Sequence, residues 1–150
     1  LTTAPYIILL NSDTRVYPNW DKTMIAWQRK HDVAQVGYLG GWLDHNGRGK
    51  NKGGFGYNVD YICGHCFSIN RDTYNKYGLF DEVNLKFAYC EDSDYSLRIK
   101  AGGDKIYALY ARLVHHYQNK TVVTVMQEID LPSKIAGNLD HVVRKWGHIL

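Results

Sequence analysis

The sequence predicts an α/β fold in which a mixed β-sheet is flanked by helices. The first observation is a continuous apolar run at Tyr6–Leu10, which is typical of a strand buried on both faces. The second is that segments with strand-like and helix-like patterns alternate along the chain. The third is a length of 150 residues with 45% apolar and 22% charged side chains, which is ordinary for a single globular domain spanning residues 1–150.

The run at Tyr6–Leu10 is expected to be a central parallel strand, and such a strand needs neighbours on both sides. A parallel sheet is built from successive strand–helix units, yet only a short segment without an initiator Met precedes the run. We therefore expect the chain to be part of a longer protein that continues upstream of Leu1.

A helix is expected from Pro18, because proline suits the first turn of a helix. Its core-facing residues, spaced three or four positions apart, are Trp20, Met24, Trp27 and His31. A second strand is expected over Val33–Leu39. The following segment, Gly40–Gly56, is rich in Gly, Asn and Lys and predicts a long loop or an irregular excursion. A loop of that length usually has a functional use.

The second half of the chain has the pattern of further strands and helices. These are a strand over Val59–Ile69, a helix over Arg71–Tyr77 stopped by Gly78, a strand over Lys105–Tyr110 and an amphipathic helix over Ser133–Trp146. Between them, the acidic cluster at 91–94 begins a helix that Gly102 and Gly103 end.

Charge and hydropathy narrow the function classes. Eighteen Lys and Arg against fifteen Asp and Glu leave a formal net charge of +3, with the two signs interspersed, so nucleic-acid binding is not indicated. The longest apolar stretch is far too short to cross a bilayer. A cytoplasmic protein is the simplest expectation.

Three cysteines, Cys63, Cys66 and Cys90, are too few for a disulfide framework, and we expect them to be reduced. Cys63 and Cys66 have the C-x-x-C spacing of zinc and redox sites. A structural zinc site needs four ligands, however, and no second pair follows. Buried small side chains are the preferred interpretation, with zinc or redox chemistry as the alternative.

The acidic cluster contains Glu91, Asp92 and Asp94. Carboxylates in the first turn suit the positive end of the helix dipole, and this effect explains one of them. Three within four positions repel one another unless a cation, or a substrate hydroxyl that gives up a proton, offsets the charge. The cluster is therefore a candidate active-site element.

The order of motifs resembles that of family 2 glycosyltransferases. In this family a strand ends in a D-x-D or N-x-D triplet, and a G…R…GxFDE…EDxDLxxRxxxxG series follows. The matching segments here are Asn11-Ser12-Asp13, Gly64, Arg71, Gly78-Leu79-Phe80-Asp81-Glu82, Glu91-Asp92-Ser93-Asp94-Tyr95-Ser96-Leu97-Arg98, Ala101-Gly102-Gly103 and Lys145-Trp146-Gly147. Each motif alone is weak evidence, but the ordered series covers nearly the whole chain.

The resemblance implies a GT-A fold, the Rossmann-like fold of nucleotide-diphospho-sugar transferases. The implied activity is metal-assisted transfer of a sugar, with inversion, from a nucleotide-diphosphate sugar to the hydroxyl of a carbohydrate or other acceptor, as in polysaccharide biosynthesis. The first family segment, which holds the base and ribose, has no counterpart in the sequence. The resemblance thus implies that this chain is the catalytic portion, inactive or weakly active alone, of a protein that can associate peripherally with membranes.

The implied cofactor is Mg²⁺ or Mn²⁺, which would neutralise charge on the diphosphate leaving group. Asp13 is the expected metal ligand and donor-binding residue, and Asn11, where many relatives have Asp, is the expected second donor contact. An Asx turn at the strand end is the structural alternative for both. His115 or His116 can supply a further ligand, and His116 is favoured because Thr121 follows at the family spacing; a surface His pair is the alternative.

Inversion needs a base that accepts the proton of the acceptor hydroxyl. The resemblance assigns this role to Asp92, with Glu91 as the second catalytic candidate. Arg98, one turn beyond Asp94, is expected to pair with it. The expected acceptor-binding residues, for which capping, fold support or core packing are alternatives, are Gly64, Asp81, Glu82, Asp94 and Trp42.

Two other function classes remain open. A metal-dependent phosphohydrolase would also use clustered carboxylates, but it gives the GxFDE segment no role. A non-catalytic fragment or a carbohydrate- or nucleotide-binding domain is the stronger alternative. The acidic residues at both Asp13 and Asp92 favour a catalytic protein over it.

Overall fold

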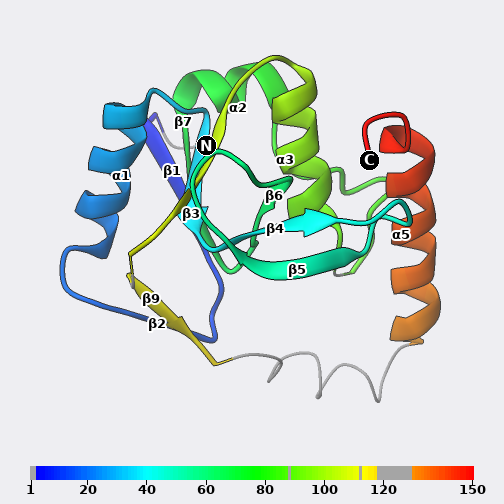
Figure 1. The fold of residues 1–150 in the computed structure, drawn as a ribbon. Coiled ribbons are helices and arrows are strands. Elements are labelled where there is room, and N and C mark those ends of the chain that lie inside the picture. The colour runs from blue at the N-terminus through cyan, green and yellow to red at the C-terminus, as the bar shows by residue number, and fades with distance from the viewer. Residues whose placement is uncertain (1–2, 88, 112, 118–129) are drawn as a thin grey trace.

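The computed structural model describes residues 3–87, 89–111, 113–117 and 130–150, so Thr121 lies outside the described residues. The chain forms a mixed α/β structure with several sheets (Figure 1). Its strands are β1 (Tyr6–Leu10), β2 (Thr14–Val16), β3 (Gln35–Tyr38), β4 (Gly40–Leu43), β5 (Gly49–Gly54), β6 (Tyr61–Ile62), β7 (Cys66–Asn70), β8 (Ile106–Leu109) and β9 (Val114–His116). The helices of the described residues are α1 (Trp20–His31), α2 (Arg71–Tyr77), α3 (Glu91–Ala101) and α5 (Leu131–Trp146).

The main sheet has the strand order β1-β7-β3-β8. β7 is antiparallel to both β1 and β3, whereas β3 and β8 are parallel. It follows that β1, β3 and β8 point the same way and end at one edge of the sheet, where β7 begins. The chain leaves β1 at this edge and runs into the small β2–β9 ribbon (Figure 1).

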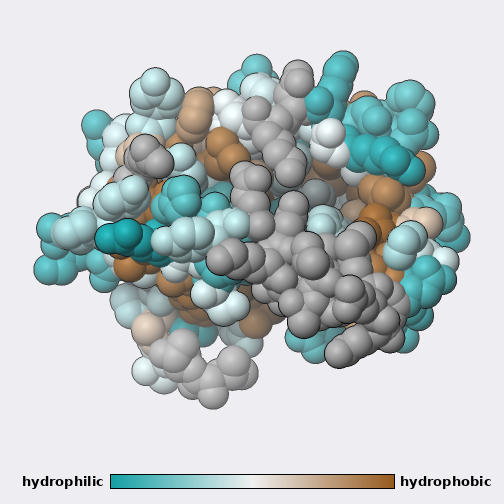
Figure 2. Space-filling model, turned by 90° about the horizontal axis from the view of Figure 1, so that it is seen from below, coloured by the Kyte–Doolittle hydropathy of each residue, from teal (hydrophilic) through white to brown (hydrophobic). Residues whose placement is uncertain are grey.

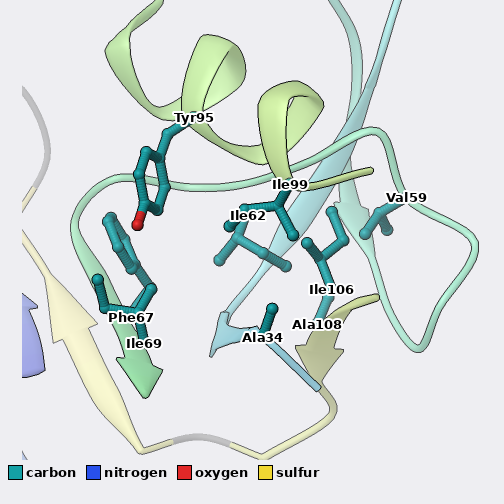
Figure 3. Close-up of a cluster of buried hydrophobic side chains, with 9 residues drawn as sticks. All are labelled: Ala34, Val59, Ile62, Phe67, Ile69, Tyr95, Ile99, Ile106 and Ala108. Atoms are coloured by element: carbon teal, nitrogen blue, oxygen red, sulfur yellow. The ribbon is translucent and has the colours of Figure 1, made fainter. Parts of the chain in front are cut away.

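Helices cover both faces of the main sheet, because alternate residues of its strands face opposite ways. The first core cluster lies between the sheet and α3, and its members are Ala34, Val59, Ile62, Phe67, Ile69, Tyr95, Ile99, Ile106 and Ala108 (Figure 3). The second lies on the α1 side and consists of Met24, Val33, Val36, Cys66, Leu109, Leu113 and Val114.

A third core cluster joins the C-terminal helix to the rest. A three-stranded antiparallel sheet with the order β5-β4-β6 packs beside α3 and α5. The buried residues that these elements share are Leu43, Tyr61, Leu85, Cys90, Leu97, Val142 and Trp146. The positions of α5 at the side of α3 and of the sheet below them are visible in Figure 1.

The predicted helices are confirmed, with small shifts at their ends. α1 begins at Trp20 rather than at Pro18, after Asn19 in the left-handed conformation with φ of 60°. α2 has the predicted bounds, and Gly78 follows it with φ of 71°. α5 starts at Leu131, two residues early, because the Asp130 carboxylate accepts a hydrogen bond from the Ser133 N–H.

The long loop predicted over Gly40–Gly56 is wrong, because β4 and β5 form a hairpin there. Asp44 closes its turn by accepting hydrogen bonds from the N–H groups of Asn46 (2.8 Å) and Arg48 (2.9 Å). Some of the glycines that suggested a loop serve packing instead. A Cβ at Gly41 would lie 2.8 Å from the ring of Tyr61 in β6, so only glycine allows β4 and β6 to approach this closely.

The single strand predicted over Val59–Ile69 is also wrong. The segment divides into β6 and β7, which belong to different sheets. The break falls at Cys63-Gly64-His65, where the chain passes from the three-stranded sheet to the main sheet. An apolar run does not reveal such a break, because both halves are buried and have similar patterns.

β1 is a strand as predicted, but it is neither central nor parallel to its neighbour. Within the described residues it pairs only with β7, and the pairing is antiparallel. Four of its residues are half-buried and Leu10 is exposed. The apolar run therefore reflects packing on both faces and does not determine the position of the strand in the sheet.

The cysteines are free thiols, and they pack in two different core clusters. Cys66 lies in the second core cluster, whereas Cys63 and Cys90 pack in the third. Burial raises the pKa of the Cys66 thiol to about 12, and burial, followed by the neighbouring carboxylates, raises the pKa of Cys90 to about 12 as well. The interpretation of the C-x-x-C pair as buried small side chains is confirmed for Cys66, whereas Cys63 is only half-buried.

Within the described part of the chain, no helix combines the length and the apolar character needed to cross a lipid bilayer.

Candidate functional site

Three motif segments meet at the edge of the main sheet where β1, β3 and β8 end. Asn11 directly follows β1, and His65 directly precedes β7. The Asn11 N–H donates a hydrogen bond to the carbonyl oxygen of His65 over 3.0 Å. This bond extends the β1–β7 pairing by one residue and fixes the start of the Asn11–Asp13 segment.

Asp13 and His116 form the first pair of the site. Oδ1 of Asp13 lies 3.1 Å from Nε2 of His116, and both side chains are largely buried, with exposed fractions of 15% and 24%. The pair is carried by the antiparallel β2–β9 ribbon, in which Thr14 lies opposite His116. The Tyr117 N–H donates to the Asp13 carbonyl oxygen over 3.0 Å, so the ribbon holds the two segments in register.

The ribbon also separates the roles of the two adjacent histidines. Successive side chains of a strand point to opposite faces. His116 faces Asp13, whereas the His115 ring lies against the ring of Tyr117, with centroids 4.8 Å apart. Of the two candidate ligands, the structure therefore places His116 beside Asp13 and leaves His115 on the other face of the ribbon.

His65 also belongs to the site, although none of the sequence motifs includes it. Its ring is buried and stacks on the ring of His116, with a centroid separation of 4.8 Å and an interplanar angle of 10°. The ring of Tyr38, from the end of β3, meets His65 edge-on at 5.9 Å. In the sequence, this histidine stands next to Gly64 and just before a strand. Its contact with His116 could not be predicted, because His116 lies far along the chain.

Asp92 joins the site through Gly64. The Gly64 N–H donates to Oδ2 of Asp92 over 2.8 Å, and the Ser93 N–H donates to Oδ1 over 2.8 Å. A Cβ on Gly64 would lie 3.2 Å from the Asp92 Cβ, which is a tight contact, so glycine favours this close approach. Gly64 therefore positions the Asp92 carboxylate, which differs from the acceptor contact expected for it.

Burial shifts the ionisation of both carboxylates at the start of α3. Burial, followed by the charge of Asp92, raises the pKa of Glu91 to about 7. Burial also raises the pKa of Asp92, although the hydrogen bonds from Gly64 and Ser93 oppose this. Side chains with such shifts are suited to accept protons near neutral pH.

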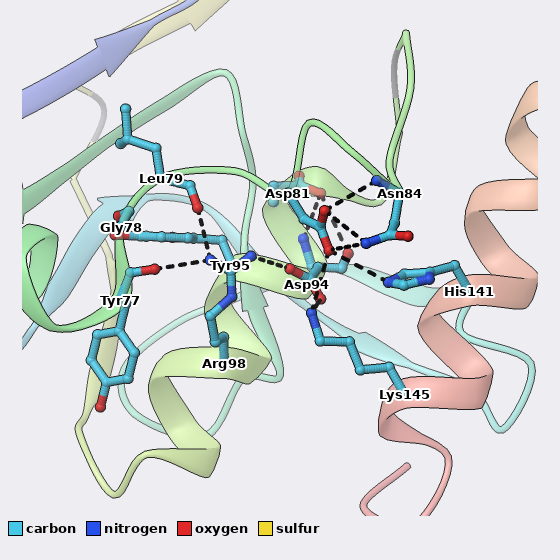
Figure 4. A network of polar contacts seen from close by, with 12 residues as sticks. Tyr77, Gly78, Leu79, Asp81, Asn84, Asp94, Tyr95, Arg98, His141 and Lys145 are labelled. Atoms are coloured by element: carbon cyan, nitrogen blue, oxygen red, sulfur yellow. Dashed lines mark hydrogen bonds and ion pairs between the residues drawn. The ribbon is translucent and has the colours of Figure 1, made fainter.

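Asp94 has a different role. Its side chain is fully buried, pairs with Arg98 as predicted, and accepts a hydrogen bond from Lys145 Nζ over 2.8 Å (Figure 4). It also accepts a hydrogen bond from Trp146 Nε1 over 2.8 Å. Burial alone would raise the pKa of Asp94, but the hydrogen bonds from Lys145, Arg98 and Trp146 outweigh it and lower that pKa. The acceptor-binding role is corrected, because a buried and fully paired carboxylate supports the fold.

The other expected acceptor residues are not brought together with Asp92. Asp81 accepts hydrogen bonds from Asn84, which hold the pKa of Asp81 below its usual range, and it lies 3.7 Å from His141 (Figure 4). Glu82 is exposed on the same turn. Trp42 is half-buried and packs against the first core cluster. Asp81 thus shapes a turn and Trp42 belongs to the core.

Asp13 and His116 have the chemistry of a partial metal site. Among residues 3–87, 89–111, 113–117 and 130–150, no group of three or more His, Cys, Asp or Glu side chains is arranged to hold a metal ion. The pair supplies one carboxylate oxygen and one imidazole nitrogen. It fits a divalent cation that takes its remaining ligands from substrate phosphates and water, as Mg²⁺ and Mn²⁺ often do.

The face toward which the β2–β9 ribbon lies, seen in Figure 2, carries mostly hydrophilic residues with smaller hydrophobic patches outside the atoms drawn in grey. A hollow of about 410 Å³, lined by Asp32, Thr73 and Lys105 among others, lies at the start of β3 and β8. It belongs to the opposite edge of the main sheet and includes none of the candidate residues.

In comparisons with known proteins, no family model matches this sequence and no curated protein matches it.

Proposed function

We propose that residues 1–150 form the catalytic and metal-binding part of an inverting glycosyltransferase with a GT-A fold. The observation that supports this most is the meeting of three motif segments at Gly64–His65. Asn11 bonds to His65, His116 stacks on His65 and pairs with Asp13, and Asp92 bonds to Gly64. The mixed sheet with helices on both faces is compatible with that fold.

In the proposed reaction, the acceptor hydroxyl attacks the anomeric carbon of the donor sugar. Asp92 accepts the hydroxyl proton while the new carbon–oxygen bond forms. The bond from the anomeric carbon to the diphosphate breaks on the opposite side, and the nucleoside diphosphate leaves with the electron pair. Attack opposite the leaving group inverts the configuration at the anomeric carbon.

Asp13 and His116 would hold Mg²⁺ or Mn²⁺, and Asn11 would contact the donor beside them. The bound cation would neutralise negative charge on the departing diphosphate. An imidazole nitrogen in the ligand set favours Mn²⁺ over Mg²⁺, because Mg²⁺ has the stronger preference for oxygen. The protein contributes a fixed pair of ligands on the β2–β9 ribbon and leaves the other positions to the phosphates.

Asp92 is favoured over Glu91 as the base because its carboxylate has a fixed orientation. Backbone N–H groups of Gly64 and Ser93 hold its two oxygens, one each. Glu91 lies beside it, and burial with the charge of Asp92 raises the pKa of Glu91 to about 7. Glu91 would therefore change charge near neutral pH and modulate the basicity of Asp92.

The metal role can be tested by measuring binding of Mn²⁺ to the chain with and without a nucleoside diphosphate, using electron paramagnetic resonance. We expect the diphosphate to strengthen Mn²⁺ binding, because it supplies the missing oxygen ligands. Asp13→Ala should weaken binding at least tenfold. Asp81→Ala is the control, since the Asp81 carboxylate holds a turn outside the candidate site. Equal binding by Asp13→Ala and the wild type would remove Asp13 from the metal site.

The base role is tested by measuring the rate of sugar transfer from nucleotide-diphosphate donors. The assay uses the longest natural form of the protein. Asp92→Asn keeps the shape of the side chain and an oxygen for the Gly64 N–H. We expect donor binding to persist while transfer slows by roughly 10²–10⁴. Unchanged transfer would move the role to Glu91. Release of inorganic phosphate without an acceptor would instead favour a phosphohydrolase, and binding without turnover a non-catalytic domain.

A further inference from the structure

The β2–β9 ribbon that carries His116 is a weak support by itself. Each strand has three residues, and a two-stranded ribbon is only marginally stable in isolation. The ribbon is fastened to the core through Val114, which is buried in the second core cluster. Val114 and His116 point to the same side of the ribbon. The burial of Val114 fixes the strand but not the ring of His116, so a separate contact is needed to hold that ring in one orientation.

The ring of His65 supplies this contact. The two rings stack in parallel, with centroids 4.8 Å apart and an angle of 10° between their planes. This stacking restricts rotation of the His116 ring about its side-chain bonds. Nε2 of His116 is thereby directed at Asp13, 3.1 Å away. A second residue that orients a ligand commonly changes metal affinity by about 10–100-fold.

His65 can act as a rigid support because it is itself held on several sides. It is only 7% exposed, and Tyr38 meets its ring edge-on with an interplanar angle of 82°. Its carbonyl oxygen accepts the Asn11 N–H, and it lies next to Gly64, which binds Asp92. The residue is therefore anchored to the main sheet, between the metal side and the base side of the site.

The geometry points to His65 as a positioning residue that aligns the His116 imidazole with Asp13 through its ring plane. This inference rests on the proposed function, since the alignment matters for binding a divalent cation. It assigns His65 a stacking role, so another planar ring at this position should preserve the site. An aliphatic side chain should not.

Four variants test this role in the full chain: His65→Phe, His65→Leu, His31→Leu and Asp13→Ala. His31 is the matched control, because it also stacks between rings, at 4.8 Å from Trp27 and 4.3 Å from Tyr107, but away from the site. Binding of Mn²⁺, with and without a nucleoside diphosphate, is measured by electron paramagnetic resonance. The proton resonances of the His116 ring are followed by NMR without metal.

We expect His65→Leu to weaken Mn²⁺ binding about tenfold and to move the His116 ring resonances downfield, because the ring current is lost. The Mn²⁺ affinity of His65→Phe should stay within about threefold of the wild type. Phe keeps a planar ring at this position, and buried substitutions of similar volume usually cost little. His31→Leu should leave both readouts unchanged. Urea unfolding of each variant separates these effects from a loss of folded protein.

The inference alone is overturned if the wild type binds Mn²⁺, Asp13→Ala does not, and His65→Leu binds as well as the wild type. It is also overturned if His65→Phe is as weak as His65→Leu, because the ring plane would then not be the cause. If the wild type binds no Mn²⁺ with or without a nucleoside diphosphate, the metal role in the proposed function fails and the positioning role fails with it.

Discussion

At the scale of single residues, two carboxylates two positions apart have opposite roles. A separation of two residues corresponds to about 200° around a helix. Asp92 therefore faces the Gly64 segment, whereas Asp94 faces α5 and the side chains of Lys145 and Trp146. The D-x-D spacing in α3 places one acid in the candidate site and the other in the support of the fold.

Glu91 belongs to the same turn, and its ionisation should reduce stability. Burial, followed by the charge of Asp92, raises the pKa of Glu91 from the ordinary 4.5 to about 7. The folded state thus binds this proton more tightly than the unfolded state, so stability falls as the pH rises from about 4.5 to about 7. We expect Glu91→Gln to raise the free energy of unfolding by about 1–3 kcal/mol above pH 7.

The same substitution should change little below pH 4, because Glu91 is then protonated in both states. Urea unfolding at a series of pH values measures the effect. Exposed Glu82 provides the control, and Glu82→Gln should stay within about 0.5 kcal/mol of the wild type. A Glu91→Gln variant that is less stable than the wild type at pH 8 would contradict the prediction. A gain in stability would indicate that Glu91 serves the candidate site at the expense of the stability of the fold.

At the scale of elements, close packing between strands depends on glycine. Gly37 lies in β3, between β7 and β8. A Cβ at this position would lie 2.7 Å from the carbonyl oxygen of Cys66 and 2.8 Å from the Cβ of Phe67. Those backbone and core atoms cannot move aside easily, so the glycine allows β3 to lie inside the main sheet near the break between β6 and β7.

Two glycines should respond in opposite ways to alanine. Gly37→Ala should lower the free energy of unfolding by about 1–3 kcal/mol through overpacking. Gly137 lies on the exposed side of α5, with no atom within 4 Å of a Cβ placed there. Gly137→Ala should therefore raise it by about 0.5–1 kcal/mol, because alanine favours the helix. Denaturant titration of both variants decides, and a stabilising Gly37→Ala would contradict the packing described here.

At the scale of the whole molecule, Asp94 links elements that are distant in the sequence. Its partners are Arg98 in α3 and Lys145 and Trp146 in α5. The Arg98 guanidinium also donates to the carbonyl oxygens of Tyr77 (3.0 Å) and Leu79 (2.7 Å), at the end of α2 (Figure 4). One buried carboxylate thus joins three helices.

Asp94→Asn should lower the free energy of unfolding by about 3 kcal/mol at pH 7, the lower end for breaking a buried ion pair, since both cations are partly exposed. Asp140→Asn is the matched control, because Asp140 and Arg144 form an i, i+4 pair with exposed fractions of 62% and 69%. This control should lose less than about 0.5 kcal/mol.

The effect of Asp94 should also depend on pH. Its hydrogen bonds lower the pKa of Asp94 below the ordinary 3.8, so its stabilisation is complete above that value and is lost as the pH falls further. The difference between Asp94→Asn and the wild type should therefore shrink below about pH 4. Guanidinium unfolding at pH 7 and pH 3 measures it, and a difference that grows in acid would contradict the ion-pair explanation.

The helices could be predicted well from the sequence, because their signals are local. The apolar spacing of α1 and α5, the acids at the start of α3 and the glycines after α2 and α3 depend only on neighbours within a few positions. The candidate metal and base residues, Asp13, His116 and Asp92, were also identified from the order of their motifs, although their chemical roles remain proposals.

Only the tertiary structure decided how these elements meet. The edge position of β1 and the β2–β9 ribbon depend on pairing between distant segments. So does the contact of His65 with His116, which lie on opposite sides of α2 and α3 in the chain. The hairpin of β4 and β5 is local, but its Gly-rich sequence lacks the apolar pattern of strands. Local patterns specify which faces of a helix or strand are apolar. The free energy of packing selects which distant segment each face contacts, and no local pattern contains that information.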